Sequence, residues 1–86
     1  MDKKRVLNIV KLFLKSEHTH YGLKVKKIDE RIINTYDGEY PLIEITYEKT
    51  NVDVEPNICS KISNNIGLYT GLKYKRDFWI GVTVEK

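Results

Sequence analysis

The C-terminal stretch Leu68-Tyr-Thr-Gly-Leu-Lys-Tyr-Lys-Arg-Asp-Phe-Trp-Ile-Gly-Val-Thr-Val84 decides how the chain is expected to fold. Apolar residues alternate with other residues in both halves, and this period of two predicts two strands. Lys75-Arg76-Asp77 is interpreted as a three-residue hairpin loop with Asp77 in the left-handed region. Even-numbered residues then face the core, with Tyr74 opposite Phe78 and Leu72 opposite Ile80.

The odd face of this hairpin is the first candidate interaction surface. It places Tyr69 opposite Thr83, Gly71 opposite Gly81, and Lys73 opposite Trp79. One hypothesis is a platform on which nucleic-acid bases stack, since stacking on aromatic side chains needs no sequence code. The alternative is that the aromatic rings only cover the two glycines and repair the sheet. The candidate surface comprises Tyr69, Gly71, Lys73, Lys75, Arg76, Trp79, Gly81 and Thr83.

An earlier hairpin is predicted from residues 23–34 and 40–48, joined at Asp37-Gly38, because Asp-Gly suits a two-residue type I′ turn. That register sets Ile32 opposite Ile43 and Ile28 opposite Tyr47. On the other face it pairs Arg31 with Glu44 and Lys27 with Glu48. Glu30 is then misplaced on the apolar side opposite Ile45. The parity of Leu23 and Val25 predicts a β-bulge near Lys26-Lys27.

The N-terminal residues 2–16 are predicted to form an amphipathic helix with Asp2 as its N-cap, because apolar residues recur at helical spacing. Its apolar arc is wider than one sheet face would cover. This surplus, with a lysine stripe beside it, makes a second candidate surface on helix one, which consists of Lys4, Leu7, Lys11, Leu12 and Lys15.

A second helix is indicated after Asp53-Val-Glu-Pro56, since proline is tolerated in a first helical turn. Ile58, Ile62 and Ile66 form one row at a spacing of four residues. Gly67 suits the C′ position that ends a helix.

The expected fold is therefore one α+β domain over residues 1–86, with the element order αββαββ. We expect a two-layer sandwich in which two helices cover one face of a four-stranded, mainly antiparallel sheet. This order resembles a ferredoxin-like chain with its first strand moved to the C-terminus. The likeness implies a strand order of three, four, two, one, with the last strand central and parallel to the second, and no activity.

Composition limits the functional classes. The chain has 86 residues, 41% of them hydrophobic, and a formal net charge of +3. No apolar run is long enough for a membrane-spanning helix, so we predict a cytoplasmic protein that does not contact a membrane. Cys59 is the only cysteine, which leaves no internal disulfide, and it is interpreted as a small buried apolar residue.

Catalytic and metal-binding signatures are weak. His18-Thr-His20 resembles half of a metal site, but no other ligand stands at a diagnostic spacing. The sequence has no glycine-rich phosphate loop and no nucleophile–base motif. We therefore predict a non-enzymatic protein with no metal, no cofactor and no small-molecule substrate.

Two functional classes remain. The first is a protein-interaction or assembly module, such as an accessory or inhibitor protein of a phage or mobile element, which binds a protein partner or itself. The second is a nucleic-acid-binding module that uses the aromatic and basic sheet face. Glu44 and Glu48 are expected on that same face and would repel phosphate, so the assembly module is preferred.

Overall fold

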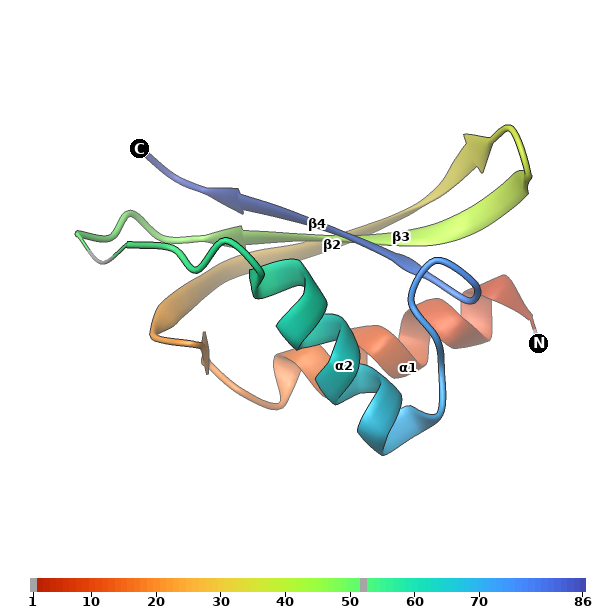
Figure 1. The fold of residues 1–86 in the computed structure, drawn as a ribbon, viewed down its shortest axis with the longest axis horizontal. Helices are drawn as coiled ribbons and strands as arrows, with labels where there is room; N and C mark the ends of the chain where they lie inside the picture. The colour runs from red at the N-terminus through yellow and green to blue at the C-terminus, as the bar shows by residue number, and fades with distance from the viewer. Residues whose placement is uncertain (1, 52) are drawn as a thin grey trace.

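The computed structural model describes residues 2–51 and 53–86. The elements follow the chain as α1 (Lys3–Lys15), β1 (Thr19–His20), β2 (Leu23–Thr35), β3 (Gly38–Tyr47), α2 (Ile58–Thr70) and β4 (Trp79–Val84). The strands form one mixed sheet in the order β1-β2-β3-β4, curled like half of a barrel (Figure 1). The α+β class is confirmed. The predicted order αββαββ is wrong, because the described elements follow αβββαβ.

Helix α1 agrees with the sequence analysis. Asp2 is its N-cap, and its carboxylate accepts a hydrogen bond from the Lys4 backbone N–H. The apolar residues at helical spacing, Val6, Val10 and Leu14, are buried. The helix therefore begins and ends within one residue of the predicted bounds.

The β2–β3 hairpin forms, but the predicted register is wrong by two residues. Its turn is Tyr36-Asp37, because Thr35 pairs with Gly38, whose φ is 130°. The Thr35 hydroxyl closes this turn by donating to the Gly38 carbonyl and accepting from the Asp37 N–H. A shift of two residues keeps every side chain on its predicted face.

The new register changes the partners across the hairpin. Arg31 lies opposite Leu42 rather than Glu44, yet its guanidinium still reaches the Glu44 carboxylate diagonally at 2.7 Å. Lys27 lies opposite Thr46 rather than Glu48. Exposed ion pairs contribute little to stability. The predicted pairs of Arg31 with Glu44 and of Lys27 with Glu48 are therefore too weak to set the register, which the turn determines instead.

The structure also tests two further predictions for β2, the β-bulge and the position of Glu30. The β-bulge is confirmed, because the register shifts between Val25 and Lys27. Glu30 lies opposite Ile43 rather than Ile45, which keeps it on the apolar side of the sheet. There its carboxylate pairs with the Lys11 ammonium of α1 at 3.3 Å. An ion pair at the margin of the sheet thus accounts for its position.

Helix α2 lies farther along the chain than predicted, because it begins at Ile58, after Pro56 rather than with Pro56 in its first turn. The strand predicted over residues 68–74 does not form. The helix continues to Thr70 and is capped by Gly71, which has a φ of 78°. Gly67 is inside the helix rather than at C′. A Cβ there would lie 3.2 Å from the Leu72 carbonyl oxygen, so a glycine lets the chain return closely over the helix. The chain then turns back, which buries Leu72.

The core lies between the sheet and the helices. Ile43, Ile45 and Tyr47 alternate along β3 and are fully buried, together with residues of both helices. Helix α1 contacts β2 and β3, and α2 contacts β4 and α1. Figure 1 draws both helices below β2, β3 and β4.

Strand β4 is parallel to β3. This confirms the prediction that the last strand is parallel to the second strand of the first hairpin. Its inward face is also confirmed, because Phe78 and Ile80 are buried while Val82 and Val84 pack against the core. The predicted central position is wrong. With no strand at residues 68–74, β4 stands at the end of the strand order.

Candidate functional site

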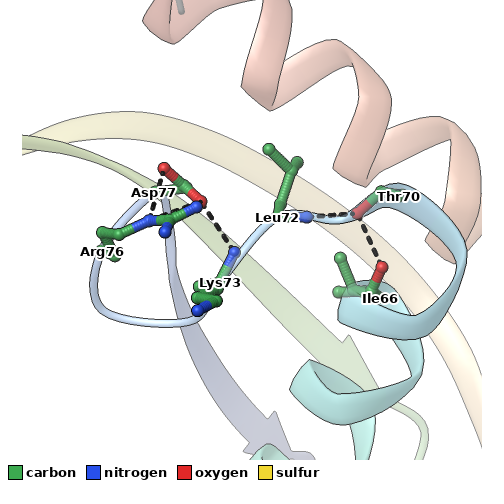
Figure 2. Close-up of polar contacts among 6 residues, drawn as sticks. All are labelled: Ile66, Thr70, Leu72, Lys73, Arg76 and Asp77. Atoms are coloured by element: carbon green, nitrogen blue, oxygen red, sulfur yellow. Dashed lines mark hydrogen bonds and ion pairs between the residues drawn. The ribbon is translucent and has the colours of Figure 1, made fainter.

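A short connection from Gly71 to Phe78 positions the start of β4 (Figure 2). The Thr70 hydroxyl donates to the Ile66 carbonyl at 2.6 Å and accepts from the Leu72 N–H at 3.2 Å. Farther along, the Asp77 carboxylate accepts from the Lys73 N–H at 2.7 Å and pairs with Arg76 at 2.9 Å. These bonds fix where the chain enters β4.

The residues Lys75-Arg76-Asp77 form a turn between Tyr74 and Phe78, but the predicted hairpin is wrong, because these two residues make only an isolated parallel bridge and Leu72 does not pair with Ile80. The left-handed residue is Lys75, with a φ of 69°, rather than Asp77. The Asp77 carboxylate instead closes the loop, and the Arg76 side chain and the Lys73 N–H hold its pKa below the usual value. The Lys75 N–H donates to the Phe78 carbonyl at 2.8 Å, so the loop covers the edge of the sheet beside Phe78.

Trp79 is half-buried in a cluster of aromatic rings. Its ring meets those of Tyr40 and Tyr74 edge-on, with centroids 6.3 and 5.7 Å away. The Lys75 ammonium lies 5.5 Å from the centroid of the indole ring. The indole Nε1 is buried and has no hydrogen-bond partner. Trp79 therefore contacts its own chain on several sides.

The predicted candidate surface is divided in the structure. Trp79, Gly81 and Thr83 lie on β4, facing the same side as Leu42, Glu44 and Thr46. Tyr69 is in α2, where its ring packs 5.5 Å from that of Phe13. Gly71 is the helix cap, so the expected pairs of Tyr69 with Thr83, Gly71 with Gly81 and Lys73 with Trp79 are wrong. The structure does not bring Tyr69 and Trp79 into one platform.

The backbone of β4 has one side that faces away from β3. The Glu85 N–H donates to the Tyr47 carbonyl at 3.0 Å, and backbone groups alternate in direction along a strand. The N–H and C=O groups of Thr83 and Gly81 thus point toward β3, while those of Val82 and Val84 point outward. We call these outward groups of Val82 and Val84 the open edge.

The open edge begins where the loop stops covering β4. The Ile80 carbonyl, which also points outward, accepts a long hydrogen bond of 3.5 Å from the Tyr74 hydroxyl. No described residue bonds to the outward groups of Val82 and Val84. Both side chains are only half-buried although they face the core, and no residue from Phe78 to Val84 is charged. An uncharged, uncovered strand edge is a template for pairing with another strand.

The second candidate surface, on α1, is also partly changed. Leu7 is buried at 7% exposure, whereas Leu12 is 71% exposed. Lys11 is half-buried and paired with Glu30, while Lys4 and Lys15 are exposed. The protein's own core thus covers part of the wide apolar arc.

His20 has a structural position. Its Nε2 lies 3.1 Å from the Leu14 carbonyl, which can only accept, so this nitrogen carries a hydrogen and donates. Its Nδ1 lies 2.8 Å from the Tyr47 hydroxyl, whose pKa is raised by burial. His20 thereby links the end of α1 to β3. His18, by contrast, is exposed.

Among the described residues, 2–51 and 53–86, neither a metal cluster nor a membrane-spanning helix is found. In this part of the chain, no group of three or more His, Cys, Asp or Glu residues could hold a metal ion. No helix there has the length and apolar character needed to cross a membrane. A cavity of about 420 Å³ opens between α1 and α2, lined by Phe13, His20, Tyr21 and Tyr69 among others.

A comparison of the chain with protein-family models, curated proteins and solved structures finds no match.

Sequence reasoning missed the open edge. It placed β4 in the centre of the sheet, where both sides of its backbone would be bonded. The available signal was the uncharged run from Phe78 to Val84. That run is typical of a central strand, so it did not distinguish a covered strand from an uncovered one.

Proposed function

We propose that this protein is a non-enzymatic protein-interaction module that binds a polypeptide by adding a strand to β4. The observation that carries the proposal is the open edge at Val82 and Val84, which is uncharged and has no partner among the described residues. In such strand addition, main-chain hydrogen bonds supply affinity and alternate side chains supply specificity.

The side chains along β4 support this mode of binding. On the core side, Val82 and Val84 are half-buried, so an added strand would cover the apolar surface that they still expose. On the other side, Thr83 is exposed and Gly81 leaves room for a partner side chain. In this proposal both helices cover one face of the sheet, and the added strand extends the sheet past them.

Replacing Val82 with proline tests the proposal selectively. The Val82 N–H points away from β3, so proline removes no bond of the β3–β4 ladder, and edge strands tolerate proline. The change removes a donor that a bound strand needs. Val82→Thr is the matched control, because it keeps both the N–H and a β-branched side chain.

The measurement is selection of short, unconstrained peptides from a displayed library on immobilised protein. We expect the wild type and Val82→Thr to enrich extended, β-branched sequences. Val82→Pro, checked by circular dichroism to be folded, should bind the selected peptides roughly tenfold more weakly, since it lacks about one net hydrogen bond and its ring obstructs pairing. Equal binding by Val82→Pro, or no enrichment on the wild type, would contradict the proposal.

A further inference from the structure

We propose that the strand added to β4 is β4 of a second copy of this chain, antiparallel to the first and related to it by a twofold axis at Thr83. This inference rests on the proposed function, because it names the occupant of the same open edge. The resulting dimer has one continuous sheet across both protomers. Such an interface is isologous, so each protomer offers the same residues to the other.

The register follows from which backbone groups are uncovered. In an antiparallel pair, two residues directly opposite can exchange both of their hydrogen bonds if their groups face each other. The outward groups of β4 beyond the loop are those of Val82 and Val84. Pairing Val82 with Val84 of the partner subunit, and Val84 with Val82 of the partner subunit, satisfies all of them.

A twofold axis one residue earlier, at Val82, is less favourable. It would set Ile80 opposite Val84 of the partner subunit, where the Ile80 carbonyl already accepts from Tyr74. The loop beside Phe78 also occupies this part of the edge. The axis at Thr83 leaves both features in place.

The side chains are self-complementary about that axis. Val82-Thr83-Val84 reads the same in both directions, so valine faces valine on the core side and threonine faces threonine on the other. Pairs of β-branched residues and pairs of threonines are favourable across strands. The two copies therefore match without any change of side chain.

In the same register, the carboxylates nearest to the axis, those of Glu85 and Glu44, meet no uncompensated like charge. Each Glu85 lies opposite Gly81 of the partner subunit, where there is no side chain to clash. Glu85 is already paired with Lys26 of its own chain, and Glu44, beside Gly81, is paired with Arg31. Both carboxylates thus keep a counter-charge in the dimer.

Disulfide trapping tests the register. In a Cys59→Ala background, which removes the native thiol, Thr83→Cys puts two cysteines directly opposite each other at the axis. Residues opposite each other in a pair without mutual hydrogen bonds have Cα atoms about 4.5 Å apart, within the range for a disulfide. We expect Thr83→Cys to form a covalent dimer on mild oxidation.

Gly81→Cys is the matched control, since it lies on the same face of the same strand. A Cβ at Gly81 would make only ordinary contact with Glu44, at 3.7 Å, so the change is tolerated. Alone it should not cross-link, because two copies of residue 81 are far from the axis. Mixed with Glu85→Cys, it should cross-link to the other variant.

Sedimentation equilibrium of the unmodified chain separates the failure of this inference from that of the proposed function. The expected result is a dimer that Val82→Pro weakens at least about tenfold, because two donors are lost across the symmetric interface. A chain that stays monomeric at millimolar concentration would overturn the proposal that β4 pairs with a second copy. The proposed function would still stand if the binding of selected peptides depended on Val82. A dimer that is insensitive to Val82→Pro and not trapped by Thr83→Cys would also overturn the pairing of two β4 strands.

Discussion

The two edges of the sheet differ in how they meet solvent. At one edge, β1 pairs with Leu23 and Lys24 of β2. Beyond these two residues, the outer side of β2 has no neighbouring strand among the described residues. The stretch of β2 from Lys24 to Arg31 carries six charged residues and a bulge at Lys26. At the other edge, the six residues of β4 carry no charge, and the register of β4 with β3 contains no shift from Trp79 to Val84.

Charges and bulges are the usual means by which proteins protect strand edges from unwanted pairing. The β2 edge has both, and the β4 edge has neither over Val82-Thr83-Val84. The loop before β4 covers only its first residues. The difference indicates that pairing is prevented at β2 and left available at β4.

The largest expected effect compares two proline variants of β4. Thr83→Pro removes an N–H that points toward β3, whereas Val82→Pro removes one that points outward. We expect Thr83→Pro to lower the free energy of unfolding by roughly 2 kcal/mol or more beyond Val82→Pro, since it breaks a bond of the β3–β4 ladder and leaves the facing β3 carbonyl without its donor. Urea unfolding of dilute, monomeric protein measures this. Similar losses would mean that the outward side of β4 is not open.

A smaller effect is expected at the loop that covers the start of the β4 edge. The lowered pKa of Asp77 means that its ionised form stabilises the folded chain. This contribution is present above the unfolded pKa of about 3.8 and is lost as the pH falls through the lower folded pKa. Asp77→Asn should cost about 1 kcal/mol at neutral pH, because it removes a charge-assisted bond.

The pH dependence provides the control for that variant. The difference in thermal stability between wild type and Asp77→Asn should shrink as the pH is lowered below 4, because the wild-type carboxyl becomes protonated. A difference that stays constant down to pH 2 would show that the carboxylate charge does not close the loop.

Introducing a charge at the dimer axis should change the affinity of association more modestly. Thr83→Lys and Thr83→Glu each place like charges directly opposite each other, which weakens a strand pair by up to about 1 kcal/mol, or roughly fivefold in affinity. An equimolar mixture should recover association as a heterodimer. Native mass spectrometry distinguishes the species, and failure of the mixture to recover would argue against an antiparallel pair centred on Thr83.

The smallest effect is expected where the two edges are linked by an ion pair. Lys26, at the bulge of β2, pairs with Glu85 just after β4, and both side chains are partly exposed. Exposed ion pairs contribute about 0.2–1 kcal/mol. Lys26→Ala should therefore change the unfolding free energy by no more than that in urea titrations. A larger loss would mean that the bulge positions β4.

The sequence was sufficient to predict features that local patterns determine. Helix α1 follows from apolar spacing and the Asp2 cap, and the bulge follows from the parity of Leu23 and Val25. The inward face of β4 follows from its alternation. The turn of the first hairpin was misplaced because the Thr35 hydroxyl and the φ of Gly38 favour Tyr36-Asp37 over the Asp-Gly pair.

The strand order could not be predicted, because residues 68–70 fit two periods. Leu68 and Thr70 alternate with their neighbours as in a strand, yet Thr70 also extends the helical row of Ile62 and Ile66. The cap at Gly71 and the return of the chain over Gly67 favour the helix, and these are tertiary features. Without that strand, β4 moves from the centre to the edge, so the candidate surface changes with it.

Amide hydrogen exchange along β4, measured at several protein concentrations, tests the central claim most directly. In dilute protein we predict slow exchange at Gly81, Thr83 and Glu85, whose N–H groups face β3, and fast exchange at Val82 and Val84. At high concentration, Val82 and Val84 should become protected as the second strand binds. Protection of both amides at every concentration, or at none, would contradict the account of an open edge that takes up a further strand.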